Sequence, residues 1–238
     1  MAQSNPKRLD RRDYHVVWIC PGVALDPARV MLDEEHNRPI YNADYDENSY
    51  ICGTMEGHNV VLATNPPGMS GNVIAGRFAG PIFNTFPNIK MTMLIGIGGG
   101  VPSPTPADDT LKDIHLGDVM VGWPGDGKQA VVYYESGRLL HDGYKHKGDK
   151  ESCAGCNDFE MVVRNPRTRK HQNQFIFHRG QIGTGNAIVV DANHRDSISK
   201  RCGGLQCIEM SAAGVDANKN CLVIRGISDY YNTHKNEI

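Results

Sequence analysis

The stretch MTMLIGIGGGVP at residues 91–102 decides the fold class, because an apolar run leads directly into a run of glycines. Residues 91–97 predict a buried strand, which ends in Gly98, Gly99 and Gly100. Glycines at such a place let backbone N–H groups approach an anion or a sugar closely. The stretch lacks the Gly-Lys-Ser/Thr of a Walker loop and the small third residue of a dinucleotide fingerprint. The spacing alone leaves both a structural turn and a ligand-binding loop open.

Strand-like and helix-like stretches alternate on both sides of this run. Apolar or alternating runs predict strands at 14–20, 49–52, 59–63, 118–122, 130–134, 178–183, 187–190 and 221–227. Helices are predicted at 28–32 with Asp26 as the N-cap, at 71–86 and at 193–202. The strand at 130–134 is the expected partner of the strand at 118–122, and the strands at 49–52 and 59–63 are expected to form a hairpin around Glu56-Gly57. The alternation predicts an α/β layer fold with a mainly parallel sheet, whose ligand sites lie at the carboxyl ends of strands.

Two carboxyl groups stand next to predicted strands. Ser228-Asp229 directly follows the strand at 221–227, and Glu209 precedes a short helix of small residues at 211–214. A partly desolvated carboxyl group at a strand end can act as a general acid, although an Asp in this place also caps turns. Glu209 is suited either to accept hydrogen bonds from two sugar hydroxyls or to serve as a structural carboxylate. The pattern leaves both interpretations of both residues open.

The cysteines and histidines indicate one weak metal candidate. Cys153 and Cys156 have zinc-ligand spacing, but one pair supplies only half a site, which His146 and His171 could complete. No HxxxH or HExxH spacing occurs, which argues against a catalytic metal. The polar segment 141–174 around this pair is long, contains a basic run at 164–170, and predicts a variable insertion or lid.

The composition indicates a globular protein of a reducing compartment. The chain has 238 residues, 39% of them hydrophobic, and a net charge of −2. This length predicts one domain over 14–238 after a flexible leader over 1–13. The chain has no apolar run long enough to span a membrane and no secretory signal, and its 7 cysteines suggest reduced thiols. These features predict a cytoplasmic protein without a membrane or nucleic-acid partner.

Motifs spread along the chain resemble the purine nucleoside phosphorylase / methylthioadenosine nucleosidase superfamily, in particular its fungal branch of nucleoside phosphorylase domains. They are MLDEEH (31–36), FPNIK (86–90), LIGIGGGVP (94–102), IHLGDV (114–119), CAGC (153–156), GTGN (183–186), IEMSAAG (208–214) and LVIRGISDY (222–230). The resemblance runs from about residue 14 to 237 and implies a three-layer α/β/α fold with a central mixed sheet. The family's C-terminal helix after the Asp motif is missing from the sequence.

The resemblance also implies an activity of nucleoside metabolism, the cleavage of the N-glycosidic bond of a purine nucleoside by a glycosyltransferase or hydrolase. Asp229, oriented by Ser228, would protonate the leaving purine at N7. The residues implied in substrate binding are Gly98 and Gly99 at the phosphate or water site, Asn186, Ile188 against the base, Glu209, Met210 under the ribose, and Ser211. No cofactor is implied apart from phosphate as a co-substrate, and the partners are a small nucleoside-like molecule and further copies in a homo-oligomer.

Two departures from the family pattern keep a second function open. Ser211 stands where the family has a Glu that binds both ribose hydroxyls, and such a loss costs about 2–4 kcal/mol, or roughly a hundredfold in rate. The first loop, 21–26, has Ala24 close to the expected acidic residue and carries only Asp26 as an acid. The alternative to an enzyme is therefore a scaffold that has lost glycosidic cleavage and binds a ligand, serves another small-molecule reaction, or only supports assembly.

Overall fold

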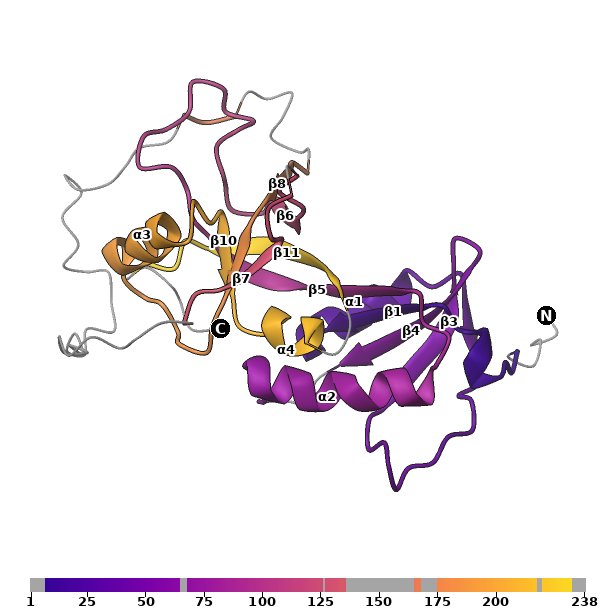
Figure 1. Ribbon diagram of the computed structural model, residues 1–238. Helices are drawn as coiled ribbons and strands as arrows, with labels where there is room; N and C mark the ends of the chain where they lie inside the picture. The colour runs from indigo at the N-terminus through magenta and orange to yellow at the C-terminus, as the bar shows by residue number, and fades with distance from the viewer. Residues whose placement is uncertain are drawn as a thin grey trace. The chain divides into compact units, whose positions relative to one another are not determined.

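The structure is a computed structural model, and it describes residues 7–64, 68–125, 127–135, 165–167, 175–217 and 220–232 (Figure 1). The chain divides into two compact units. Unit 1 comprises Met1–Gly96, Thr184–Asn186 and Met210–Arg225, and unit 2 comprises Ile97–Gly183, Ala187–Glu209 and Gly226–Ile238. Cys153 and Cys156, the zinc candidates, lie outside the described residues.

Unit 1 is built on a mixed set of strands that begins near the N-terminus. The strands are β1 (Val16–Cys20), β2 (Glu34–His36), β3 (Tyr50–Met55), β4 (His58–Thr64) and the first part of β5 (Met91–Gly100). β1 lies between β4 and β5 and runs parallel to both. β3 pairs antiparallel with β4 and with β2. Glu56 and Gly57 have φ of 47° and 74°, as a tight hairpin turn requires, and the hairpin predicted here is confirmed.

Two helices of unit 1 meet without side chains between them. α2 (Asn72–Thr85) confirms the helix predicted at 71–86 and continues past Pro81. α4 (Ala212–Asp216) packs on it through a glycine, because a Cβ on Gly214 would lie 1.9 Å from the carbonyl oxygen of Asn72. The backbone N–H of Gly214 donates to Asn72 Oδ1 at 3.3 Å. This close contact holds the small-residue segment that follows Glu209.

Two expectations for the N-terminal part of unit 1 need correction. α1 (Leu25–Val30) follows a 3-10 turn at Gly22–Ala24, so Asp26 lies inside its first turn and is not its N-cap. Residues 7–13, expected to belong to a flexible leader, have a defined course. Arg8 forms a β-bridge with Asn37, and Arg11 donates to the carbonyl oxygens of Asn84 and Thr85 at 3.3 Å, where α2 ends. The N-terminal segment therefore caps the C-terminal end of that helix.

Unit 2 is built on shorter strands. They are the last part of β5, β6 (Val119–Gly122), β7 (Val131–Tyr133), β8 (Phe177–Gly180), β9 (Ile182–Thr184), β10 (Cys207–Glu209) and the end of β11 (Leu222–Asp229). β10 pairs antiparallel with β5, with Cys207 opposite Gly100 and Ile208 opposite Gly99. β6 pairs parallel with β8 and also pairs with β11, whereas β7 pairs with β9. The predicted pairing of 118–122 with 130–134 is therefore wrong.

Two further predictions for unit 2 differ from the structure. Gly98–Gly100, expected as a loop, continue β5, because the ladder with β10 supplies backbone partners that a glycine run can use as well as any other residue. Residues 187–190, expected as a strand, form none. The helix predicted at 193–202 is confirmed as α3 (Ala192–Arg201), with Asp191 Oδ1 accepting from the N–H of His194 at 2.9 Å.

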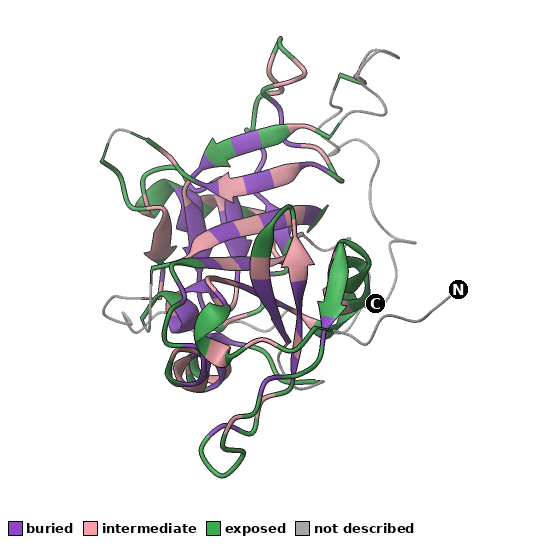
Figure 2. Cartoon of the chain, turned by 90° about the vertical axis from the view of Figure 1, so that its right-hand side faces the viewer, coloured by how far each residue is buried: buried purple, intermediate pink, exposed green. Residues whose placement is uncertain are grey.

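Each unit has a cluster of buried apolar residues, and buried residues lie mainly along the strands (Figure 2). In unit 1 the cluster consists of Trp18, Cys20, Ala28, Val60 and Leu62, and in unit 2 it consists of Val101, Tyr134, Val189, Ile198, Leu205, Ile208 and Tyr231. Helices beside a sheet of parallel and antiparallel pairs make this an α/β fold with a mixed sheet, as predicted. No helix in the described part of the chain is long and apolar enough to cross a membrane.

Candidate functional site

The acidic end of β11 carries the residues that the sequence singled out. Ser228 Oγ lies 2.9 Å from Asp229 Oδ2, to which it donates, and 3.4 Å from the carbonyl oxygen of Gly98. The N–H of Tyr231 donates to Asp229 Oδ1 at 2.8 Å. Both carboxylate oxygens of the half-buried Asp229 are thus fixed by neighbours in the chain.

Tyr231 is an unusual neighbour for that carboxylate. Its φ is 49°, in the left-handed region that side chains other than glycine rarely adopt, and its side chain is only 4% exposed. Burial raises the pKa of the Tyr231 phenol, and the nearby Cys207, Asp229 and Glu209 raise it further. The phenol therefore lies within electrostatic reach of both carboxyl groups that the sequence pointed to, and sequence reasoning gave it no role.

The glycines of β5 and the carboxyl group of Glu209 lie in the same region of unit 2. Gly98 and Gly99 are buried, and Glu209 is 3% exposed at the end of β10, one residue beyond the pair Ile208–Gly99. The ends of β5, β10 and β11 therefore bring together Gly98, Gly99, Glu209, Ser228 and Asp229. The ligands of these residues stay a prediction.

The predicted base-contacting residue lies on a loop that β7 holds. Ile188 is 61% exposed. Its neighbour Ala187 is fixed on both sides, since its N–H donates to Glu135 Oε1 at 2.8 Å and its carbonyl oxygen accepts from the Tyr134 hydroxyl at 3.2 Å. The Tyr133 hydroxyl donates to Glu135 Oε2 at 2.9 Å. Sequence reasoning missed Glu135, although it follows a strand in the same manner as Asp229.

Asn186, Met210 and Ser211, which were also predicted to bind substrate, belong to unit 1. Asn186 Oδ1 accepts from the N–H of Asn72 at 3.0 Å and so binds the first turn of α2. Ser211 directly precedes α4, and its side chain makes no capping hydrogen bond to that helix. Met210 is half-buried. The side-chain oxygen of Asn186 is therefore engaged at the start of α2.

The first loop of unit 1 lies against a buried arginine. A Cβ on Gly96 would lie 2.7 Å from Arg225 Nη1 and 3.1 Å from Pro21 Cδ, and Arg225 is 3% exposed. Gly96 thus makes room for a guanidinium group beside the loop that starts at Pro21. Arg225 occurs in one of the quoted motifs, but the sequence assigned it no role. A buried arginine next to the expected catalytic loop is the signal that could have found it.

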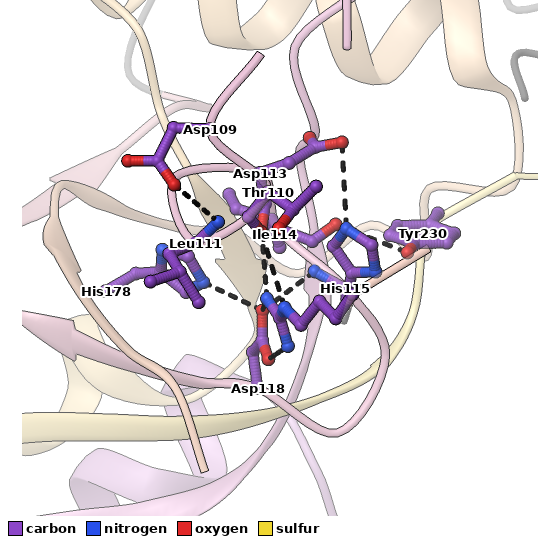
Figure 3. A network of polar contacts seen from close by, with 10 residues as sticks. Asp109, Thr110, Leu111, Asp113, Ile114, His115, Asp118, His178 and Tyr230 are labelled. Carbon is purple, nitrogen blue, oxygen red and sulfur yellow. Dashed lines mark hydrogen bonds and ion pairs between the residues drawn. The ribbon is translucent and has the colours of Figure 1, made fainter. Parts of the chain in front are cut away.

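A second polar network surrounds Asp118 at the start of β6 (Figure 3). Arg167 Nη2 donates to Asp118 Oδ2 at 2.6 Å, and Arg167 Nη1 binds Oδ1. His178 Nε2 and the N–H of His115 each lie 2.8 Å from Oδ2. Arg167 also donates to the carbonyl oxygens of Thr110 and Asp113.

Burial alone would raise the pKa of the Asp118 carboxyl group. Hydrogen bonds from Arg167 and His178 and from the N–H of His115, with the charge of Arg167, outweigh burial and hold that pKa well below its usual range. The basic run at 164–170 was expected to be part of an insertion or lid, yet its Arg167 has a side chain only 10% exposed. Arg167 therefore anchors residues 165–167 to the segment before β6.

Metal binding finds no support in the described part of the chain. Among those residues, no group of three or more His, Cys, Asp or Glu side chains could hold a metal ion.

Comparison of the sequence with known proteins gave one informative relative. No protein-family model matches the chain. A nucleotide-binding leucine-rich repeat (NLR)-like protein from Hyaloscypha variabilis is 29% identical over 286 residues, which cover 96% of this chain and 28% of that protein. The chain therefore spans less than a third of the length of this relative.

Comparison of the structure with solved structures gave nucleosidases. The 5′-methylthioadenosine/S-adenosylhomocysteine nucleosidase from S. pneumoniae, with a transition-state inhibitor, has a TM-score of 0.60 and 19% identity over 92% of this chain and 87% of that one. The Neisseria meningitidis nucleosidase with methylthio-immucillin-A has 0.60 and 17% over 92% and 87%. A futalosine hydrolase mutant of Helicobacter pylori has 0.56 and 13% over 90% and 88%. The resemblance drawn from the motifs is confirmed in the architecture, and the chain has the fold of the 5′-methylthioadenosine/S-adenosylhomocysteine nucleosidases.

Proposed function

We propose that the chain binds a purine nucleoside and cleaves its N-glycosidic bond, with Asp229 as the general acid. The observation that carries this proposal is the arrangement at the end of β11, where Ser228 Oγ and the N–H of Tyr231 each hold one oxygen of the Asp229 carboxyl group. A general acid must be held in place before it can transfer a proton to a leaving group.

The chemistry follows from where the electrons go. As the C1′–N9 bond breaks, its electron pair passes to the purine and the sugar becomes oxocarbenium-like. The proton of the Asp229 carboxyl group moves to N7, which makes the purine a neutral leaving group. The carboxylate left behind keeps the hydrogen bonds from Ser228 and Tyr231, which stabilise its charge. Water then adds to C1′ and gives up a proton, and the Asp229 carboxylate takes up a proton again from the solvent; in phosphorolysis an oxygen of phosphate adds to C1′ in place of water. Besides water, phosphate is the one co-substrate that the reaction admits, and no cofactor is needed.

The remaining site residues have supporting roles in this proposal. In unit 2 the exposed Ile188 contacts the purine, Glu209 accepts from ribose hydroxyls, and Gly98 and Gly99 approach the water or phosphate. Contacts of Met210 and Ser211 with the ribose stay predictions. Asn186 contributes by fixing the start of α2. A cytoplasmic place, one domain over 14–238 and assembly as a homo-oligomer stay predictions.

A second function, ligand binding without cleavage, is favoured by three observations. Ser211 is too short to bind two ribose hydroxyls as the family's Glu does, and Ala24 stands in the first loop where an acid is expected. The relative from Hyaloscypha variabilis is NLR-like and much longer than this chain. In this case the chain recognises a nucleoside as the ligand-binding part of a longer protein.

Chromatography of a nucleoside panel distinguishes the two functions. Adenosine, inosine and 5′-methylthioadenosine are incubated with the protein, with and without phosphate, and free base is measured. Cleavage by the wild type, lost about a hundredfold or more in Asp229→Asn, supports the first proposal. The matched control is Asp191→Asn, which changes the same side chain at the N-cap of α3, where Asn caps as well as Asp. Binding in calorimetry without release of base supports the second function, and full activity of Asp229→Asn contradicts the mechanism.

A further inference from the structure

The contact between Gly99 and Tyr231 is among the tightest that a glycine makes in the described part of the chain. A Cβ built on Gly99 would lie 1.2 Å from Tyr231 Cδ2 and 1.9 Å from Cε2. Cγ, at the base of the ring, would lie only 2.5 Å away, so a small rotation of the ring cannot clear a methyl group. The Tyr231 ring thus occupies the space that any side chain at position 99 would need.

The Tyr231 ring has little freedom to move elsewhere. It is buried in the core cluster of unit 2 with, among others, Val101, Tyr134, Val189 and Ile208. Interiors of this kind are close-packed, so a side chain displaced at one point must move its own main chain or push its neighbours. A side chain introduced at position 99 would therefore displace the ring and, with it, the backbone of Tyr231.

The backbone of Tyr231 is the part that touches the proposed general acid. Its N–H donates to Asp229 Oδ1 at 2.8 Å, and it does so from a left-handed conformation with φ of 49°. A non-glycine residue keeps such a conformation only when its surroundings hold it there. Among these surroundings, the clearest contact is the packing of the buried Tyr231 ring against Gly99.

We propose that Gly99 is a positioning residue for Asp229. Because Gly99 has no side chain, the Tyr231 ring packs directly against it, and this packing, here called the seat, orients the Tyr231 N–H toward the Asp229 carboxyl group. The effect of the seat on catalysis rests on the proposed function, whereas the seat itself is independent of it. It gives Gly99 a role different from the approach to phosphate or water that the motif implies. The glycine is required because of what packs on it, whether or not a ligand also comes near.

A double-mutant cycle separates the two roles of Gly99. The variants are Gly99→Ala, Tyr231→Ala and both together, with Tyr231→Phe as the matched control that keeps the ring and loses only the hydroxyl. If the seat operates, Gly99→Ala lowers kcat by about a hundredfold and changes KM little, because the acid is displaced while the binding groups stay. In the Tyr231→Ala background the same methyl group meets no ring and has little further effect.

A second readout needs no activity. The amide proton of residue 231 is protected from hydrogen exchange as long as its hydrogen bond to Asp229 exists, and NMR measures this protection residue by residue. We expect the protection in the wild type and Tyr231→Phe, and its loss in Gly99→Ala and in Tyr231→Ala alone. The last variant leaves Gly99 untouched, so it tests the ring even where Gly99→Ala does not fold. Thermal melting should rank Gly99→Ala below the double variant.

The results that overturn the proposal are distinct from those that overturn the function. An equal loss of kcat from Gly99→Ala in both backgrounds, or a loss confined to the KM for phosphate, would mean that Gly99 contacts the co-substrate directly. Unchanged protection of the residue 231 amide in Tyr231→Ala would show that the ring does not orient the N–H. A wild type that cleaves no nucleoside yet shows the NMR pattern would refute the proposed enzyme and retain the seat.

Discussion

Asp118 shows at the scale of one residue how a charge is kept in a nearly water-free place. Its side chain is 2% exposed, and Arg167, His178 and the N–H of His115 supply donors to its two oxygens. Removing a carboxylate from water is costly unless such donors replace the water. The pKa of this carboxyl group lies well below its usual range, because these donors and the charge of Arg167 outweigh the effect of burial.

The lowered pKa of Asp118 predicts acid sensitivity. Asp118 releases its proton at lower pH in the folded state than in the unfolded state, where an Asp side chain has a pKa of about 3.9. The stabilisation is therefore complete above that pH and is lost as the pH falls below it. In Asp118→Asn, we expect a smaller decrease in the free energy of unfolding between about pH 5 and 2. At pH 7 the variant should be less stable by about 3 kcal/mol, because the Arg167 charge loses its partner.

Urea unfolding over a pH series measures both effects. Asp109→Asn is the control, since Asp109 lies in the same loop with a side chain 50% exposed. The control should follow the wild-type curve closely, because exposed ion pairs contribute little. If acid lowered the free energy of unfolding equally in Asp118→Asn and in the wild type, the lowered pKa of Asp118 would be contradicted.

Ser211 is the residue on which the choice between cleavage and binding depends. If the scaffold still positions a nucleoside, Ser211→Glu supplies the missing acceptor for two ribose hydroxyls. We expect kcat/KM for 5′-methylthioadenosine to rise about a hundredfold. Ser211→Gln, which has the same length without the charge, should give a much smaller rise. Steady-state release of adenine measures this, and a Ser211→Glu protein that still binds but does not cleave would favour the binding function.

At the scale of elements, β7 and the loop around Ala187 act as one piece. Glu135 and Tyr134 hold the N–H and the carbonyl oxygen of Ala187, so the end of β7 decides where Ile188 points. Glu135→Ala should raise the dissociation constant for a purine nucleoside about tenfold, since one hydrogen bond to a charged group is worth about 1.5–3 kcal/mol. Glu135→Gln should restore most of the affinity, because its amide oxygen can still accept from Ala187. Calorimetry measures both, and equal affinities for Glu135→Ala and the wild type would separate β7 from ligand binding.

Elements whose signals are local could be predicted, and those that depend on distant partners could not. The hairpin around Glu56-Gly57 and α2 follow from turn residues and periodicity within the segment itself. The pairing of β6 with β8 joins strands far apart in the chain, and nothing in either strand names the other. Gly98–Gly100 were predicted as a loop because glycines have low strand propensity, whereas the ladder with β10 extends the strand through them.

The candidate site follows the same rule. Asp229 was singled out because a carboxyl group at the end of an apolar strand is visible in one segment. The role proposed for Tyr231 could not be inferred in this way, because it depends on packing on Gly99 in another strand. Arg167 was hidden in a basic run predicted as part of an insertion or lid, and only the position of Asp118 gives it a buried partner. The sequence therefore indicates candidate groups for the chemistry, whereas the contacts that hold them join distant segments.

At the scale of the whole molecule, the division into two units cuts through individual strands. The boundary between Gly96 and Ile97 falls inside β5, and the boundary between Arg225 and Gly226 falls inside β11. Within β5, Met91–Leu94 pair with β1, whereas Gly99 and Gly100 pair with β10. A strand whose two halves serve different ladders cannot lose one ladder without loosening the residues that begin the other.

This continuity predicts that both units unfold in one cooperative transition, as one domain over 14–238 would. The chain has 2 tryptophans: Trp18 is 8% exposed in unit 1 and Trp123 is 61% exposed in unit 2. In Trp123→Phe, fluorescence reports on the core of unit 1 alone, whereas circular dichroism reports on the strands and helices of both units. We expect the two urea curves to have the same midpoint, which is the test for two-state unfolding. Midpoints that differ would mean that each unit folds on its own. The two units would then be separate domains connected by the shared strands β5 and β11.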